Sequence, residues 1–296
     1  MQNSDTEQKS HERAVSAGIL YIVATPIGNL ADLSDRARQV LAEVTLIAAE
    51  DTRHSGQLLA HITRQGSLQP YHDFSNQAQT DKLLSRLALG ESVALITDAG
   101  TPLISDPGFR LVQLAREQGI AVFPVPGACA VTAALSVAGL PTDSFAFEGF
   151  LPSKSGARQE KLRSLQDETR TVVFYESPHR VAKSLQDMLK EFGNDRLVFI
   201  AREMTKKFEE HFLGTLGEAC EWIAADDYRS KGEFVVVISG ADEQVLKQNA
   251  MHRGLAMVHE LRADMSLKRA VTLAAKFSGA RKNELYAAAL ANEADD

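Results

Sequence analysis

The chain has 296 residues, of which 44% are hydrophobic and 24% charged, as in a globular protein long enough for two small domains. Its formal net charge of −7 argues against a protein that is basic throughout but allows a local basic patch for nucleic acid. Two cysteines, Cys129 and Cys220, and eight scattered histidines form neither a disulfide framework nor a clustered set of metal ligands. No apolar run approaches the ~18 residues of a membrane span.

Residues 1–17 are polar and lack the apolar core of a signal peptide, which predicts a disordered leader on a cytoplasmic protein. Residues 18–141 alternate between strand and helix patterns, which is typical of an α/β domain with a parallel sheet. Its first strand is Ile19–Thr25, and Pro26 opens the turn that follows. This turn is either a simple connector or part of a ligand site at the sheet end.

Two carboxylates stand where the second predicted strand, Thr45–Ala49, ends. Glu50 and Asp51 can serve as a general base and its partner. They can equally cap the next helix, predicted over Ser55–Thr63, because acidic side chains favour helix N-termini. Arg53 follows them and is a candidate contact for an anionic substrate.

The central stretch of the chain is the strand Val93–Thr97 with the polar segment Asp98–Gly108 behind it. The strand is apolar and rich in β-branched residues, as a strand buried on both faces is. Ligands of open α/β sheets bind outside the carboxyl ends of the strands. The segment is therefore either an ordinary turn or a rigid cradle, in which Gly100 permits close backbone approach. Asp106 is predicted to cap the helix that follows.

The next strand, Ala121–Val125, leads through Gly127 into a helix of small residues. Small residues at a helix start let a ligand approach the backbone N–H groups. Residues 142–240 predict a second α/β domain with a mixed sheet. In it, Leu151–Arg158 is expected to be a basic loop that is either solvated or in contact with RNA.

The strand Thr171–Glu176 ends in a second informative turn. Ser177 is predicted to cap the next helix, which places Arg180 in its first turn. A cation there opposes the helix dipole, and this predicts a nearby anion such as a phosphate. Lys231, Gly232 and Glu233 precede the last strand and are expected to form a tight turn toward the ligand.

Residues 241–296 form a tail of different composition. Residues 247–282 contain two acids and eight basic residues, a local balance of +6, so the rest of the chain carries −13. Ser266 is predicted to start a helix that Gly279 ends, and Asn283–Leu290 to form another. Two helices around a glycine turn suggest a helix-turn-helix. The tail either packs on the body or contacts nucleic acid.

Five blocks of sequence, in order, resemble the tetrapyrrole-methylase-like (class III) methyltransferases: TPIGNL from Thr25, EDTR from Glu50, DAGTPLISDPG from Asp98, PVPGA from Pro124 and FYESPHR from Phe174. Within that superfamily they most resemble the branch that methylates the ribose of a cytidine in the decoding centre of 16S ribosomal RNA. The resemblance implies two αβα domains with the cofactor cleft between them and a small C-terminal helical element. It also implies S-adenosylmethionine as methyl donor, the small ribosomal subunit as partner, and a homodimer.

The resemblance also points to site residues. The expected donor contacts are Pro26, Asp98, Ala99, Gly100, Thr101, Ile104, Ser105, Gly127, Tyr175, Ala201 and Gly232. A ribose hydroxyl is a poor nucleophile until its proton leaves, and the candidates to assist are Glu50, Asp51, Glu176 and Lys231. The expected RNA contacts are Arg53, Arg180, Lys268, Arg269, Arg281 and Lys282.

Two other functions compete with this interpretation. The wider superfamily methylates tetrapyrrole precursors, but the segment from Asp98 departs from the Gly-Asp-Pro pattern associated with those enzymes, and a basic tail has no use there. A nucleotide-binding regulator without chemistry is the second alternative.

Overall fold

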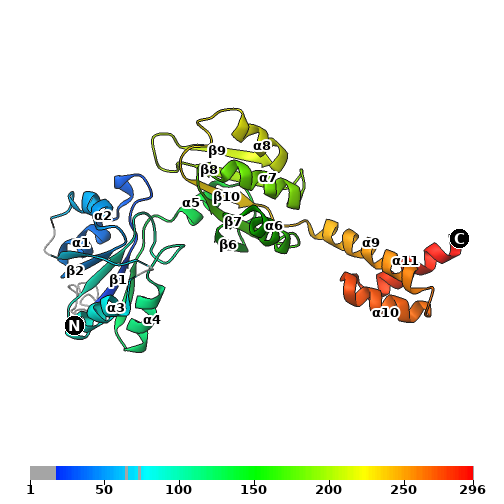
Figure 1. The fold of residues 1–296 in the computed structure, drawn as a ribbon, viewed down its shortest axis with the longest axis horizontal. Coiled ribbons are helices and arrows are strands. Elements are labelled where there is room, and N and C mark those ends of the chain that lie inside the picture. The colour runs from blue at the N-terminus through cyan, green and yellow to red at the C-terminus, as the bar shows by residue number, and fades with distance from the viewer. Residues whose placement is uncertain (1–17, 64–65, 73–74, 296) are drawn as a thin grey trace, which may run out of the picture.

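The computed structural model describes residues 18–63, 66–72 and 75–295, and the predicted leader over residues 1–17 lies outside these ranges. Figure 1 shows two α/β units side by side, with a small helical unit set apart beyond the second. No helix in the described ranges is both long and apolar enough to cross a lipid bilayer.

The first sheet is parallel throughout, as expected, with the strand order β3-β2-β4-β1-β5. Its strands are β1 (Ile19–Val23), β2 (Leu46–Ala49), β3 (Ser67–Pro70), β4 (Val93–Ile96) and β5 (Ala121–Val125). Every residue of β4 is buried, because the strand lies at the centre of the sheet with a core cluster on each face. The helices of this unit are η2 (Leu30–Asp32), α1 (Asp35–Glu43), α2 (Thr52–Leu59), α3 (Gln77–Ala88) and α4 (Phe109–Glu117).

The second sheet is mixed, which confirms the prediction, with the order β6-β7-β10-β8-β9. Strands β6 and β7 run parallel, and the other neighbours are antiparallel. The strands are β6 (Phe145–Phe150), β7 (Thr171–Glu176), β8 (Leu197–Arg202), β9 (Glu210–Thr215) and β10 (Phe234–Ile238). One face packs on the helices α6 (Ser155–Ser164), α7 (Val181–Phe192) and α8 (Leu216–Ala224).

Helix α5 (Ala130–Val137) joins the two units. It follows β5 of the first sheet, yet its residues Val131 and Leu135 pack on the other face of the second sheet, against Val173 and Val235. The two sheets are therefore held together by a shared apolar core and not by a flexible linker alone.

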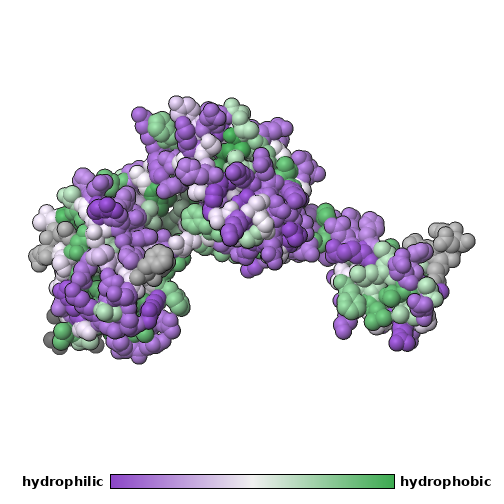
Figure 2. All heavy atoms as spheres, in the orientation of Figure 1, coloured by the Kyte–Doolittle hydropathy of each residue, from purple (hydrophilic) through white to green (hydrophobic). Residues whose placement is uncertain are grey.

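The tail folds around an apolar cluster of its own. It consists of α9 (Glu243–Leu261), α10 (Leu267–Ser278) and α11 (Lys282–Asp295). Gly279 ends α10 in the left-handed conformation, as predicted, whereas the long helix α9 was not predicted. Figure 2 shows apolar side chains gathered on the visible face of this unit.

Three predicted helix starts are wrong. Helix α2 begins at Thr52 with Asp51 as its N-cap, not at Ser55. Helix α4 begins at Phe109 after Gly108, because the carboxylate of Asp106 instead accepts a hydrogen bond from Thr97 Oγ1 at 3.0 Å.

The third of these helices is α7. It begins at Val181, and Ser177 contributes its backbone carbonyl, not its hydroxyl, to this turn. In α4, a tertiary contact takes the carboxylate that a local cap would use.

The predicted basic loop is also partly wrong. Residues from Ser155 onward form α6, and the guanidinium of Arg158 is buried, with Nη2 2.6 Å from Oδ2 of Asp187 on α7. A buried guanidinium requires such a partner. Arg158 is therefore a structural residue that is not accessible to RNA.

Candidate active site between the two sheets

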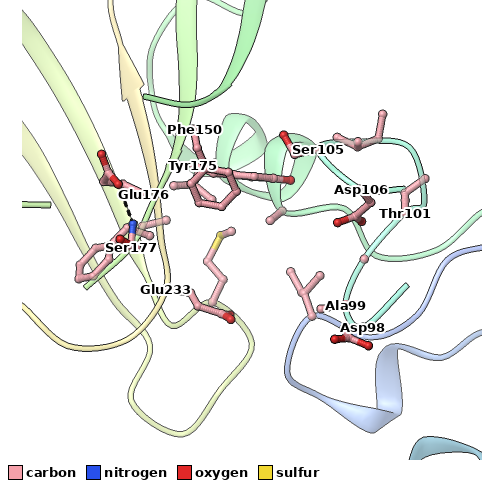
Figure 3. A pocket seen from close by; sticks show the side chains of 18 of the residues that line it. Asp98, Ala99, Thr101, Ser105, Asp106, Phe150, Tyr175, Glu176, Ser177 and Glu233 are labelled. Carbon is pink, nitrogen blue, oxygen red and sulfur yellow. Dashed lines mark hydrogen bonds between the residues drawn. The ribbon is translucent and has the colours of Figure 1, made fainter. Parts of the chain in front are cut away.

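A cavity of about 460 Å³ lies between the two units. Its lining comes from the carboxyl ends of β2 and β4 in the first sheet and from β6, β7, β8 and β10 in the second (Figure 3). The volume lies within the range of small-molecule sites, roughly 300–1,000 Å³. The location is the one that the polar segment after β4 predicted.

The first wall is the segment behind β4. Gly100 exchanges two backbone hydrogen bonds with Thr25, of 2.8 and 3.1 Å, and Thr101 Oγ1 donates to the carbonyl of Ala128 at 3.0 Å. These bonds tie the segment to the ends of β1 and β5. Gly100 has a φ of +86°, a conformation that side chains disfavour. The wall is therefore a rigid backbone surface.

Backbone strain is concentrated at the cavity. Leu103 and Ser105, on either side of Ile104, have φ of 73° and 65°. The first and third residues of Glu203–Thr205 have φ of 52° and 63° around Met204. Within the described ranges these are the non-glycine residues of positive φ, and both central side chains line the cavity. Such strain persists where the surrounding structure enforces it, commonly at functional sites.

The second wall is aromatic. The Tyr175 ring lies 4.9 Å from the Phe147 ring and 5.6 Å from the Phe150 ring, centroid to centroid. Burial, with smaller effects from Cys129 and Asp106, raises the pKa of the Tyr175 hydroxyl. The hydroxyl therefore stays protonated, and Tyr175 packs against the same apolar cluster as Val131 of α5.

Glu176 is buried at the end of β7 and its carboxylate is fully engaged. Its Oε1 accepts hydrogen bonds from the Ser177 N–H at 2.9 Å and from two nitrogens of Arg180 at 2.8 and 3.0 Å. Its Oε2 accepts one from Ser184 Oγ at 2.5 Å. Both oxygens are thus held by protein donors, and two of the four hydrogen bonds fix the guanidinium of Arg180.

The other candidate bases differ in their surroundings. Glu50 lines the cavity at the end of β2. Asp51 caps α2, and its hydrogen bonds with the side chain and backbone of Arg53 lower its pKa to about 2. Lys231 does not line the cavity, and its ammonium lies 4.5 Å from the centroid of the Tyr228 ring.

Comparison with known proteins decides the family. Residues 19–220 match the family described as Tetrapyrrole (Corrin/Porphyrin) Methylases, and residues 252–293 match the RsmI C-terminal HTH domain. The chain is 49% identical over 276 residues to the ribosomal RNA small subunit methyltransferase I of Pseudomonas aeruginosa, which covers 93% of this chain and 98% of the relative. The chain belongs to this methyltransferase family.

Two further similarities agree with this membership. The methyltransferase I of Vibrio cholerae is 50% identical over 279 residues, covering 93% of this chain and 96% of the relative. The structure of uroporphyrin-III C-methyltransferase from Thermus thermophilus complexed with S-adenosylhomocysteine aligns with a TM-score of 0.51 at 18% identity, covering 77% of this chain and 99% of that one. The latter likeness concerns the fold. The model that matches the tail is described as an HTH domain, and the tail is helical, as predicted.

In this member of the methyltransferase family, the cavity brings together eight of the predicted donor contacts: Asp98, Ala99, Gly100, Thr101, Ile104, Ser105, Tyr175 and Ala201. Pro26, Gly127 and Gly232 do not line it. A Cβ on Gly127 would lie 3.0 Å from the Cβ of Ala24, and one on Gly232 would lie 2.5 Å from Cγ of Glu203. These two glycines allow close backbone packing beside the cavity.

Several lining residues were missed by the sequence analysis. They include Ile27, Asp106, Phe150 and Met204. Asp106 lies inside the segment after β4, but we predicted it as a helix cap and not as a lining residue. Met204 lies in the loop between β8 and β9, and no local pattern marks it. Glu233 lines the cavity from the turn before β10, which the sequence predicted to face the ligand.

Proposed function

We propose that this chain transfers a methyl group to the ribose 2′-hydroxyl of a cytidine in the decoding centre of 16S ribosomal RNA, on the small subunit in the cytoplasm. The observation that carries the proposal is a cavity with a rigid backbone wall, located between the two sheets of a chain that belongs to the methyltransferase I family. S-adenosylmethionine supplies the methyl group, already activated on its sulfonium.

The first wall suits this donor. Gly100 leaves the backbone accessible, and a Cβ there would approach Ile27 to 3.4 Å. The carboxylate of Asp98, which accepts the Asp51 N–H at 3.2 Å, offers further acceptor capacity for hydroxyl or ammonium groups. We assign the segment from Asp98 to Ser105 to donor binding. Fixing both reactants in line then contributes much of the rate.

We assign the removal of the hydroxyl proton to Glu50. It lines the cavity, whereas Asp51 is committed to a helix cap and Lys231 lies against Tyr228. The carboxylate of Glu176, although it lines the cavity too, is held by Arg180 and Ser184.

We propose that residues 241–296 form a separate RNA-binding unit next to two α/β domains, residues 18–141 and 142–240. The tail carries the basic excess and has its own apolar cluster. Figure 1 shows the tail beyond the second α/β unit, whereas the cavity lies between the two units, so the tail would hold RNA at a distance from the reacting nucleotide. Arg53, with a side chain that is 91% exposed, is the proposed RNA contact on the body near the cavity.

We also propose a homodimer. Helix α5 covers only part of its face of the second sheet. Leu213 pairs with Phe199, so it shares that face, and Leu213 is 54% exposed. Phe145, Leu197 and Val137 are also exposed there. A second copy of the chain would remove these apolar side chains from water.

The substrate class is tested by offering labelled donor to naked 16S rRNA, to assembled small subunits and to a uroporphyrinogen-type tetrapyrrole. We expect label in RNA, recovered as 2′-O-methylcytidine after nucleoside digestion. Label in the tetrapyrrole alone would favour the small-molecule enzyme, and donor binding without any transfer would favour a regulator.

Gly100→Val should abolish donor binding while the protein stays folded, because a β-branched side chain disfavours positive φ and would displace the first wall. Calorimetry measures the affinity and circular dichroism the fold. Gly119→Val is the matched control, since Gly119 has a φ of +71° with nothing near its Cβ position. Unchanged affinity in folded Gly100→Val protein would refute the assignment.

Glu50→Gln should lower kcat by roughly 10²- to 10⁴-fold with little change in donor affinity, since it removes the proton acceptor and keeps the shape. Single-turnover methylation measures this effect. Glu43→Gln, on the exposed end of α1, should leave the rate unchanged. A normal rate in Glu50→Gln would show that proton removal does not depend on this residue.

Replacing Lys268, Arg269, Arg281 and Lys282 by Gln should weaken RNA binding and preserve donor binding. Each lost phosphate contact should flatten the dependence of log affinity on log salt by about 0.7 on single strands. Replacing the exposed Arg36, Lys82, Lys183 and Lys190 by Gln removes equal charge from the body and is the control. Equal salt slopes in both variants would assign the tail to packing instead.

Leu213→Glu should convert the dimer into a monomer, because a charge at the centre of an apolar interface is desolvated without a partner. Sedimentation velocity measures the mass. Leu89→Glu, at an exposed leucine near the end of α3, should leave the mass unchanged. A Leu213→Glu protein that remains dimeric would place the interface elsewhere.

A further inference from the structure

Phe150 is an aromatic side chain at the second wall that the donor assignment does not use. It ends β6 and lines the cavity, yet it is 53% exposed. Its ring meets the Tyr175 ring at 61° and 5.6 Å, which fixes one edge and leaves much of the ring open. The phenyl ring is therefore held in place by Tyr175, and part of its surface is exposed to solvent.

A guanidinium accompanies this ring. The Cζ of Arg180 lies 6.0 Å from the centroid of the Phe150 ring, within the range of a cation–π contact. Arg180 is kept there by two hydrogen bonds to Glu176, whose own side chain is 1% exposed. The side chain of Arg180 keeps 26% of its surface exposed. The guanidinium is thus held over one face of the ring at the cavity.

The two walls of the cavity differ in chemistry. Figure 3 shows Asp98, Thr101 and Asp106 on one side and Phe150 and Tyr175 on the other. The first wall offers backbone and acceptor groups to the donor, and the second offers rings. A ribose that receives the methyl group must lie between them, so its base extends toward the aromatic wall.

We propose that Phe150 and Arg180 form the stacking platform for the unpaired base of the nucleotide that is methylated. This inference rests on the proposed function, and it places the base of the substrate nucleotide at the second wall. RNA-binding proteins recognise unpaired bases by stacking them on aromatic rings and guanidinium planes. The arginine also carries the positive charge that an adjacent phosphate requires. Glu176 acts through Arg180 and is a positioning residue.

The adenine of the donor is also a flat base, so the experiment separates the two ligands. Phe150→Leu keeps apolar bulk and removes the aromatic face, whereas Phe150→Trp keeps a face. Donor affinity is measured by calorimetry with S-adenosylhomocysteine, and KM and kcat are measured with small subunits and labelled donor. Phe109→Leu, at a 72% exposed phenylalanine that does not line the cavity, is the matched control.

We expect Phe150→Leu to raise KM for the small subunit roughly 5- to 150-fold, the range for loss of one base–aromatic stack, with donor affinity within about twofold. Phe150→Trp should behave as the native protein. Arg180→Lys keeps the charge and loses the planar guanidinium, so it should raise KM with little change in the salt dependence of KM. Loss of donor affinity in Phe150→Leu, or kinetics equal to those of Phe109→Leu, would overturn the platform. Absence of methylation by the native protein would instead overturn the proposed function.

Discussion

Helix α5 packs on the second sheet although the strand before it belongs to the first, and the cavity depends on that contact. Val131 and Leu135 of α5 share an apolar cluster with Val173 and Val235. Tyr175 and Phe147 pack against the same cluster, so the start of the helix contacts the aromatic wall. The free energy gained by burying apolar side chains grows with the buried area, and a closely packed core leaves few voids. The shared cluster therefore keeps the two walls at a fixed separation.

Charge is divided between the parts of the chain. The tail segment over residues 247–282 carries +6, whereas the remaining residues carry −13. The cavity itself is lined by five acidic residues, Glu50, Asp98, Asp106, Glu176 and Glu233. A body of this sign repels a polyanion, and this contrast in charge is the reason why we propose the cationic tail as the place where RNA binds.

Helix α7 anchors the second wall through ion pairs at both its start and its middle. Glu176 fixes Arg180 immediately before the helix, and Asp187 within it pairs with the buried Arg158 of α6. Removing one partner of a buried pair leaves an uncompensated charge, which costs several kcal/mol in typical cases. These pairs define where the turn after β7 lies, and with it the position of the guanidinium next to Phe150.

The sequence by itself determined the strands, most of the helices, the family and the polar segment after β4, because these depend on local periodicity and on short motifs. It could not decide between a cap and a cavity position for Asp106, nor reveal that Arg158 is buried, because both depend on groups that only folding brings near. Phe150 and Met204 reach the cavity through strand pairing between distant segments. The tertiary structure alone decided them, since their role follows from position in space and not from neighbours in the chain.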